Sequence, residues 1–327
     1  MTFLGVDALA GNRTATRVPV GRYADGLPVE LPVVVIRGRR PGPTLYVQAG
    51  LHGDELTGID ICRRALHDLD AEHLSGIIAA VPLANPPAHR SRTRGADAEE
   101  RGPIDANRVF PGSPGGLLTE RIVNVLFEEF VRHADFTLDV HSALEGCTIA
   151  PFVYIDPDDD STGTLAMRER VGRAFGTPYL YFKGRGQKLG TSDMARSLRS
   201  QADVLRLPSI SAEMGESGRV TQAYVPIGVR GVHNVLRALE MEPGEIDRPA
   251  TQREFRTITL VHASEGGALR WSAELTDEVR AGQPIAEIVD VFGDPVEELE
   301  SPVDGFVLRK MLLGTAATGA EVAWIAS

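Results

Sequence analysis

Residues 44–69, TLYVQAGLHGDELTGIDICRRALHDL, combine a short apolar run with a longer segment of helical period. The run Thr44–Gln48 has the length and the apolar character of a β-strand. From Leu56 onward, apolar side chains recur at steps of three and four residues, which is the pattern of an amphipathic helix. A strand, a loop and a helix in this order are typical of α/β sheets, so the stretch predicts that fold class.

The same alternation of strands and helices continues to about residue 240. Further strands are predicted at Ile77–Val81, Phe136–Val140, Ile149–Ile155, Tyr179–Phe182 and Ser209–Glu213. Helices are predicted from Thr119, as the N-cap, to Phe130, and at Leu165–Phe175, Ser192–Ser200 and Val229–Leu239. We therefore expect residues 1–245 to form one domain in which helices flank a sheet.

The sequence changes in character past residue 240. Residues 241–252, MEPGEIDRPATQ, have the proline content of a linker, and short strands with Gly-rich turns follow. We expect a second, all-β domain over residues 250–327, which resembles the barrel-sandwich fold of lipoyl and biotinyl carriers. The modified lysine of such carriers lies in a hairpin, but the hairpin Phe292–Pro295 has none and Lys310 follows later. A structural lid or an oligomer contact is therefore the favoured role.

The composition excludes some classes of partner. The chain of 327 residues has 45 acidic against 34 basic side chains, a formal charge of −11, which argues against a broad nucleic-acid surface. No segment approaches the roughly 20 apolar residues of a membrane span. The N-terminal residues also lack the basic and apolar regions of a signal peptide. We expect a cytoplasmic protein that binds neither nucleic acid nor membranes.

Histidines and carboxylates are the groups that could hold a metal. The two cysteines, Cys62 and Cys147, are too few for a disulfide framework or a Cys-rich site, and Cys62 falls on the apolar face of a predicted helix. His52 and Glu55 lie three residues apart in the loop after the first predicted strand. This end of a strand is where α/β sheets bind ligands, although such a pair alone also fits a surface helix start.

A second strand supplies another histidine. Residues 138–142, LDVHS, predict a strand that ends in His141, with Asp139 on the same face two residues earlier. Asp139 would fix the tautomer of His141 by a hydrogen bond. With His52 and Glu55, His141 completes two histidines and one carboxylate, the ligands of a catalytic zinc site with an open fourth position. Alone, such a histidine would more simply be a core residue.

Two more segments carry chemistry. Glu213 follows a predicted strand and could take a proton from water and return it to a leaving amine, with Glu216 as the less favoured alternative. Residues 85–112, NPPAHRSRTRGADAEERGPIDANRVFPG, contain Asn107 and Arg108, which suit the binding of a carboxylate. In the same segment Arg94 could stabilise an oxyanion, and Arg101 is the runner-up for that role.

The motifs HGDELTG, DANRVFPG, LDVHS and SAEMG occur at residues 52–58, 105–112, 138–142 and 211–215. In this order and spacing they resemble the succinylglutamate desuccinylase/aspartoacylase family, a branch of the zinc carboxypeptidase-like hydrolases. The resemblance spans roughly residues 30 to 240 and implies a mixed sheet flanked by helices. It implies a zinc site and a carboxylate-bearing substrate, with these roles: His52, Glu55 and His141 as zinc ligands, Glu213 as general base and acid, Arg94 as the group that polarises the scissile carbonyl, and Asn107 with Arg108 as the carboxylate site.

Some positions depart from the family pattern. Ala106 stands where the family usually has leucine, and Ser142 replaces the asparagine of some members, so the acyl group is left open. The acidic run at residues 156–160, DPDDD, lacks the spaced ligands of a calcium loop and is interpreted as a solvated loop.

Together these features predict a zinc-dependent amidohydrolase, with one zinc per chain, that deacylates a small N-acyl amino acid. A metallocarboxypeptidase or an esterase using the same site is the alternative within enzymes. If the protein is not an enzyme, the alternative is a metal-free ligand-binding module. We also expect that the β domain joins subunits of a homo-oligomer.

Overall fold

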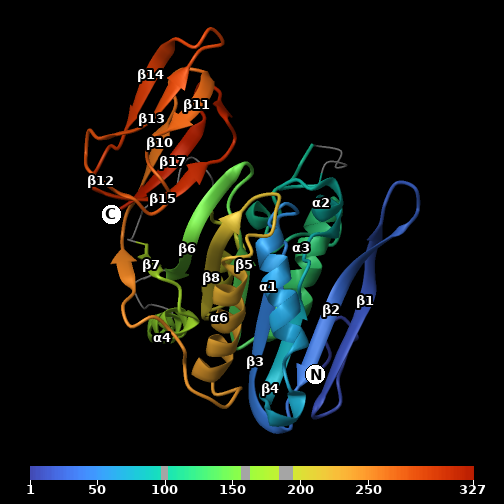
Figure 1. Cartoon of the computed structure of the whole chain (residues 1–327). Helices are drawn as coiled ribbons and strands as arrows, with labels where there is room; N and C mark the ends of the chain where they lie inside the picture. Colours follow the sequence, from blue (N-terminus) through green and yellow to red (C-terminus); the bar gives the residue numbers. More distant parts are fainter. Residues whose placement is uncertain (97–101, 156–162, 184–193) are drawn as a thin grey trace.

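The computed structural model describes residues 1–96, 102–155, 163–183 and 194–327 (Figure 1). The strands up to residue 245 are β1 (Asn12–Arg22), β2 (Pro28–Arg37), β3 (Arg40–Ala49), β4 (Ser75–Val81), β5 (Phe136–His141), β6 (Cys147–Ile155), β7 (Tyr179–Phe182) and β8 (Ser209–Glu216). The helices are α1 (Leu56–His67), α2 (Pro86–Ser91), α3 (Leu118–Glu129), α4 (Leu165–Phe175), α5 (Leu198–Val204) and α6 (Val225–Ala238). Single helical turns are η1 (Ala71–His73), η2 (Ala106–Arg108) and η3 (Val131–His133).

One large sheet runs through the molecule. Its strands follow the order β1-β2-β4-β3-β5-β8-β6 and continue with β15 (Gly305–Met311), β17 (Glu321–Ala326) and β10 (Ile258–His262). Strand β9 spans Arg253–Phe255. The central pairs β4–β3, β3–β5 and β5–β8 are parallel, while β1–β2, β2–β4 and β8–β6 are antiparallel. Strands β7 and β9 continue the sheet from β6 in parallel. The predicted α/β fold with a mixed sheet is therefore confirmed.

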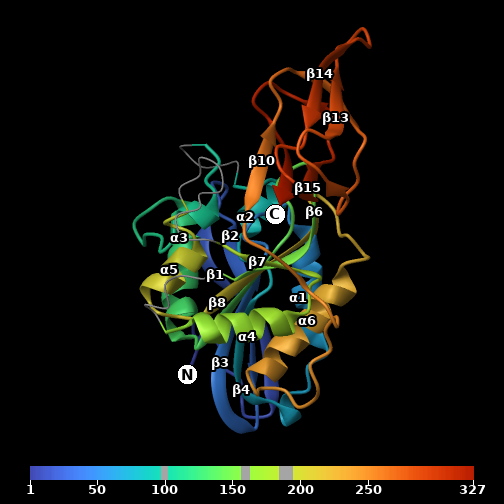
Figure 2. The ribbon, with the colours of Figure 1, turned by 90° about the vertical axis from the view of Figure 1, so that its left-hand side faces the viewer.

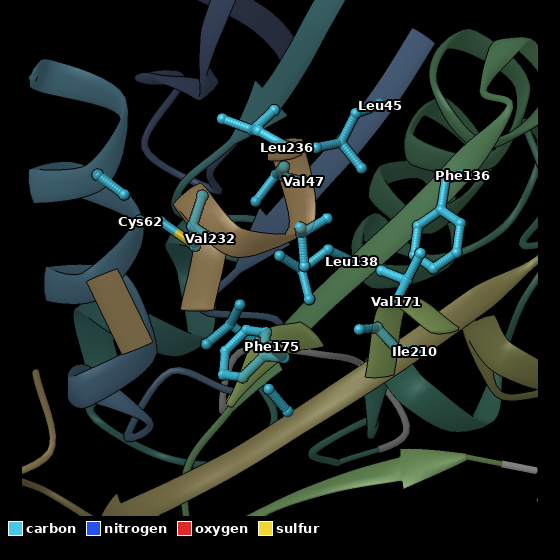
Figure 3. Packing of buried hydrophobic residues seen from close by; sticks show 14 of the residues in the cluster. Leu45, Val47, Cys62, Phe136, Leu138, Val171, Phe175, Ile210, Val232 and Leu236 are labelled. Atoms are coloured by element: carbon cyan, nitrogen blue, oxygen red, sulfur yellow. The ribbon is translucent and has the colours of Figure 1, made fainter. Parts of the chain in front are cut away.

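Helices cover both faces of the sheet (Figure 2). Helices α1, α4 and α6 pack on one face, and α3 and α5 contribute to the hydrophobic cluster of the other. In the first cluster, Leu45 and Val47 of β3 lie near Cys62 of α1 and Val232 of α6 (Figure 3). Cys62 is fully buried, as the sequence predicts for a small core residue, and burial raises the pKa of its thiol.

Strands β1 and β2 and helix α2 are absent from the predicted elements. Strand β1 pairs with β2 at one edge of the sheet and is largely exposed, so it lacks the apolar run that marks a buried strand. Helix α2 has six residues and prolines at its start, with Asn85 as a side-chain N-cap. Strand β1 is thus too polar and α2 too short for periodicity to reveal them. Strand β2 does carry a buried apolar run, Val33–Ile36, and it lies before the first strand that the sequence predicts.

Three helices begin elsewhere than predicted. Thr119 is not the N-cap of α3, because the helix starts at Leu118 and its Glu120 side chain accepts from the backbone N–H of Leu117. The first residues of the predicted helix Ser192–Ser200 lie outside the described residues, and α5 spans Leu198–Val204. Helix α6 starts at Val225 and not at Val229. Pro226 lies in its first turn, where proline is tolerated because the backbone N–H groups there have no partner within the helix.

The C-terminal strands are β9 (Arg253–Phe255), β10 (Ile258–His262), β11 (Gly267–Trp271), β12 (Glu278–Val279), β13 (Pro284–Val289), β14 (Pro295–Glu300), β15 (Gly305–Met311), β16 (Thr315–Ala316) and β17 (Glu321–Ala326). A four-stranded sheet, β14-β13-β11-β16, packs with β10, β15 and β17 around a separate hydrophobic cluster. Strand β15 pairs with β6, where Arg309 lies opposite Ile149, so this β region continues the large sheet directly. Its place beside β6 is therefore fixed by backbone hydrogen bonds.

Lys310 has a structural environment. Its side chain is buried, and Nζ donates to the carbonyl of Ala273 at 3.1 Å and to Glu274 at 2.7 Å. A swinging-arm lysine must be exposed, so the carrier role is wrong for this residue.

None of the helices in the described ranges has the length and apolar character that crossing a bilayer requires.

Candidate metal centre and catalytic pocket

The parallel pairing of β3 with β5 brings two histidines to the same edge of the sheet. Ala49 of β3 lies opposite Val140 of β5, so His141 ends its strand where the loop that carries His52 begins. Both imidazoles are buried, and their ring centres are 5.1 Å apart. Two residues far apart in sequence therefore meet because parallel strands share their carboxyl ends.

Glu55 lies between these two rings. Its Oε1 is 2.6 Å from Nδ1 of His52, and its Oε2 is 2.7 Å from Nδ1 of His141. The backbone N–H of Ser142 also donates to Oε2 at 3.1 Å. Helix α1 approaches β5 closely at Gly58, where a Cβ atom would lie 2.7 Å from the carbonyl oxygen of Val140. Glycine at this position therefore lets Glu55 reach His141.

Two aspartates hold the outer nitrogens of the histidines. Oδ2 of Asp139 lies 2.8 Å from Nε2 of His141, as predicted from their spacing, and Oδ1 of Asp105 lies 3.1 Å from Nε2 of His52. Each imidazole therefore presents Nδ1 to the centre of the site. Burial acts to raise the pKa of Asp105, but His52 and Arg94 hold it well below its usual range.

Asp139 is itself held from behind. Its Oδ1 accepts from Nε2 of Gln48 at 3.0 Å, and Oε1 of Gln48 accepts from the hydroxyl of Tyr46 at 2.8 Å. All three side chains are buried. Since both oxygens of Asp139 are occupied, its carboxylate has one orientation, which in turn orients His141.

Glu213 enters the site from β8. It lies directly opposite His141 in the parallel pairing of β5 with β8, and its side chain lines the same cavity. Burial raises the pKa of its carboxyl to about 7, with a further contribution from Glu55 and an opposing one from His141. Glu216 forms an ion pair with Arg219 at the end of the strand and does not line this cavity.

Arg94 lies beside two of the ligand candidates, His52 and Glu55. Its Nε donates to Oδ2 of Asp105 at 2.9 Å, and its Nη1 is 3.6 Å from Oε1 of Glu55. The side chain is 23% exposed, so one part of the guanidinium faces the cavity while Asp105 fixes the other. Arg101, the alternative residue for this role, lies outside the described residues.

Asn107 and Arg108 also line the cavity. Oδ1 of Asn107 accepts from the backbone N–H of Leu198 at 3.0 Å. Because that oxygen is occupied, Asn107 offers a ligand its amide donor Nδ2, the kind of group that binds a carboxylate. Arg108 donates to the backbone carbonyl oxygen of Asn107 at 2.9 Å, which holds its guanidinium next to this residue.

These groups surround one cavity of about 250 Å³. Its lining is His52, Glu55, Arg94, Asp105, Asn107, Arg108, Asp139, His141, Ser142, Leu144, Ile149, Tyr154, Met194, Ser197, Arg199, Ser211, Glu213, Leu260, Arg309, Glu321 and Trp324. All the favoured site residues therefore line the same cavity, whereas the alternative Glu216 does not. The volume suits a ligand of amino acid size.

Several lining residues escape prediction from sequence. Asp105 stands in the predicted DANR motif, but its contact with His52 depends on the path of the loop. Arg199 of α5 is buried and lies over the ring of Tyr154 at 4.0 Å, without a sequence signal of its own. Glu321 and Trp324 belong to the C-terminal β region, whose position relative to the pocket no local pattern reveals.

His52, Glu55 and His141 fit a metal ion by the chemistry of their donor atoms. One ligand atom of each lies within 4.8 Å of the others, and all three residues are buried. Two neutral imidazole nitrogens and one carboxylate oxygen, with the outer nitrogens hydrogen-bonded, form a donor set that suits zinc.

Comparison with known proteins agrees with this arrangement. The sequence profile described as Succinylglutamate desuccinylase/Aspartoacylase catalytic domain matches residues 41–239, well over half of the chain. The fold and the matching profile thus define a class of hydrolytic enzymes. The chain belongs to the succinylglutamate desuccinylase/aspartoacylase family, as its motifs predict.

Individual relatives are moderately similar. The N-alpha-acetyl-L-2,4-diaminobutyric acid deacetylase of Halomonas elongata is 29% identical over 309 residues, which cover 91% of this chain and 86% of that protein. A succinylglutamate desuccinylase/aspartoacylase structure from Rhodobacter sphaeroides has a TM-score of 0.85 at 27% identity, covering 96% of this chain and 95% of that one. The product-bound ectoine utilization protein EutE (DoeB) from Ruegeria pomeroyi has a TM-score of 0.86 at 24% identity, with the same coverage, and supports the fold.

Proposed function

We propose that this protein is a zinc-dependent amidohydrolase that removes the acyl group from a small N-acyl amino acid. The observation that carries the proposal is the shared cavity in which His52, Glu55 and His141 converge beside Glu213. The deacetylase of Halomonas elongata, whose name specifies an N-acetylated amino acid, supports amide cleavage. Residues 1–245 would carry the catalytic groups, and residues 250–327 would complete the pocket.

One zinc ion per chain would be held by Nδ1 of His52, a carboxylate oxygen of Glu55 and Nδ1 of His141. A zinc ion held this way lowers the pKa of a coordinated water towards about 7 and polarises a carbonyl. Asp105 and Asp139 contribute by fixing the imidazole tautomers from outside. The surrounding hydrogen bonds would thereby hold the two imidazoles in one orientation.

Glu213 moves the proton in this scheme. Its carboxylate takes one proton from the attacking water, whose oxygen forms a bond to the amide carbon. When the carbon–nitrogen bond breaks, Glu213 returns the proton to the departing amine, so that a carboxylic acid and an amine leave. The raised pKa of Glu213 fits both halves, because a carboxyl near neutrality accepts and donates readily.

The arginines and the asparagine position the substrate. Arg94 would stabilise the negative charge that develops on the carbonyl oxygen. Asn107 and Arg108 would bind the substrate carboxylate through amide and guanidinium donors. Because the cavity measures about 250 Å³, a small substrate is favoured over a peptide chain.

The test combines metal analysis with a substrate panel. The purified protein is assayed for zinc content and for amine release from N-acetyl, N-succinyl and N-formyl amino acids, before and after chelation and after zinc is restored. About one zinc per chain with chelator-sensitive release is expected. Activity on unblocked peptides or on esters alone would replace the proposal with a carboxypeptidase or an esterase. A chain without zinc affinity would indicate a ligand-binding module.

A further inference from the structure

The C-terminal β region places a carboxylate in the wall of the catalytic cavity. Glu321 begins β17, and it lines the cavity together with Leu260, Arg309 and Trp324. The order β8-β6-β15-β17 fixes this wall relative to Glu213. Glu213 and Glu321 thus line one cavity from β8 and β17, two strands that are separated in the sheet by β6 and β15.

Glu321 is held by two donors on one side. Nη1 of Arg309 and Nε1 of Trp324 both donate to Oε1, and Nη2 of Arg309 donates to the backbone carbonyl of Glu321 at 3.1 Å. A carboxylate has about four acceptor positions, so Oε2 can still accept from a ligand. The two donors therefore hold the carboxylate in place without using up its acceptor capacity.

The exposed member of the ion pair is the acid. The side chain of Arg309 is 2% exposed, whereas that of Glu321 is 27% exposed. A ligand in the cavity therefore meets carboxylate oxygen on this wall. The cations Arg94 and Arg108 line the same cavity near His52, at the end of β3, and the sheet order places four strands between β3 and β17. Such a separation of charge matches a ligand that has an anionic group at one end and a cationic group at the other.

We propose that Glu321 is a specificity residue that binds a free ammonium group on the substrate. The substrate class is then a small diamino acid in which one nitrogen is acylated and the other is free. This inference rests on the proposed function, since it assigns the substrate of the same site. Leu260 and Trp324 would contact the aliphatic part of such a ligand beside the carboxylate.

The test compares two substrates that differ by one ammonium group. Nα-acetyl-2,4-diaminobutyrate and Nα-acetyl-2-aminobutyrate are assayed with the wild type, Glu321→Gln and the control Glu298→Gln, a change at an exposed position of β14. The glutamine keeps an amide oxygen for Arg309 and Trp324 and removes only the charge. We expect the wild type to prefer the diamino compound in kcat/KM. The ratio should fall about 10- to 100-fold in Glu321→Gln, mainly through KM, and stay constant in the control.

A ratio that is unchanged in Glu321→Gln, a wild-type preference for the monoamino compound, or an equal loss on both substrates would overturn the inference while deacylation stands. If Glu321→Gln fails to fold because Arg309 is left buried without its partner, the double variant Arg309→Met with Glu321→Gln removes both charges. If no amide is cleaved at all, the proposed function fails. Calorimetric binding of free 2,4-diaminobutyrate and 2-aminobutyrate to wild type and variant then decides the role of Glu321 separately.

Discussion

Oδ2 of Asp139 lies 2.8 Å from Nε2 of His141, and its other oxygen accepts from Gln48 at 3.0 Å. In Asp139→Asn the new amide nitrogen must face either the donor Nε2 of Gln48 or His141, so one of these hydrogen bonds is lost. We expect zinc affinity to fall about 10- to 100-fold. Competition with a chelator of known affinity measures it. Asp68→Asn, at an exposed residue, serves as the control, and equal affinities in both variants would contradict the role of Asp139.

Glu213→Gln removes the group that moves the proton and leaves the three ligand candidates intact. We expect kcat to fall about 10²- to 10⁴-fold while zinc content stays at the wild-type level. Rapid assays of amine release with parallel metal analysis test this expectation. Glu216→Gln is the matched control, because Glu216 pairs with Arg219 outside the cavity. We expect this variant to keep the wild-type kcat. A Glu213→Gln enzyme with wild-type turnover would refute the mechanism.

Arg94→Lys tests the oxyanion role, since lysine keeps the charge but cannot donate to Asp105 and to a ligand in the same geometry. We expect a loss of about 10²- to 10³-fold in kcat. Arg101→Lys and Arg92→Lys are measured beside it, Arg92 being an exposed residue at the end of α2. If Arg101→Lys is the variant that loses kcat, the assignment passes to Arg101.

Zinc binding is expected to release protons and to tighten as the pH rises. Burial lowers the pKa of His141, but Asp139 and Glu55 outweigh it and raise this pKa well above the usual value. This raised pKa favours the protonated form of the metal-free His141, and zinc competes with that proton for the ring nitrogen. The apparent Kd should fall up to about tenfold per pH unit for each proton released. Titration calorimetry in buffers of different ionisation enthalpy counts the protons, and a count of zero would disprove this expectation.

Gly58→Ala tests the close approach of α1 to β5. The added Cβ would lie 2.7 Å from the carbonyl oxygen of Val140, so the helix must shift and carry Glu55 away from His141. We expect the free energy of unfolding to drop by about 1–3 kcal/mol, with weaker zinc binding. Thermal denaturation and chelator competition report the two effects. Gly115→Ala is the control, because no atom lies within 4 Å of its Cβ position, and similar losses there would remove the packing explanation.

Most of the central fold could be predicted because its strands and helices carry strong local patterns. Helix α4 and strand β7 have the predicted bounds, and β5 and β8 extend the predicted strands at their carboxyl ends. The edge strand β1 escaped because an exposed strand needs no apolar face. Helix ends such as that of α3 depend on single capping contacts, which periodicity does not register.

The candidate chemical groups of the site can be identified from short motifs. His52, Glu55, His141 and Glu213 stand in short motifs at the ends of predicted strands, and parallel strands bring such ends together. Asp139 was predictable for the same reason, since residues two apart on a strand share a face. Local order and spacing were enough for these positions.

The residues that surround those groups depend on contacts between distant parts of the chain. Asp105 reaches His52 because of the path of its loop, and Glu321 enters the cavity because β15 pairs with β6. Neither contact has a periodicity or a fixed spacing, because each depends on backbone pairing between segments far apart in the chain. The reacting groups are thus a property of motifs, whereas the walls that choose the substrate arise from long-range strand pairing.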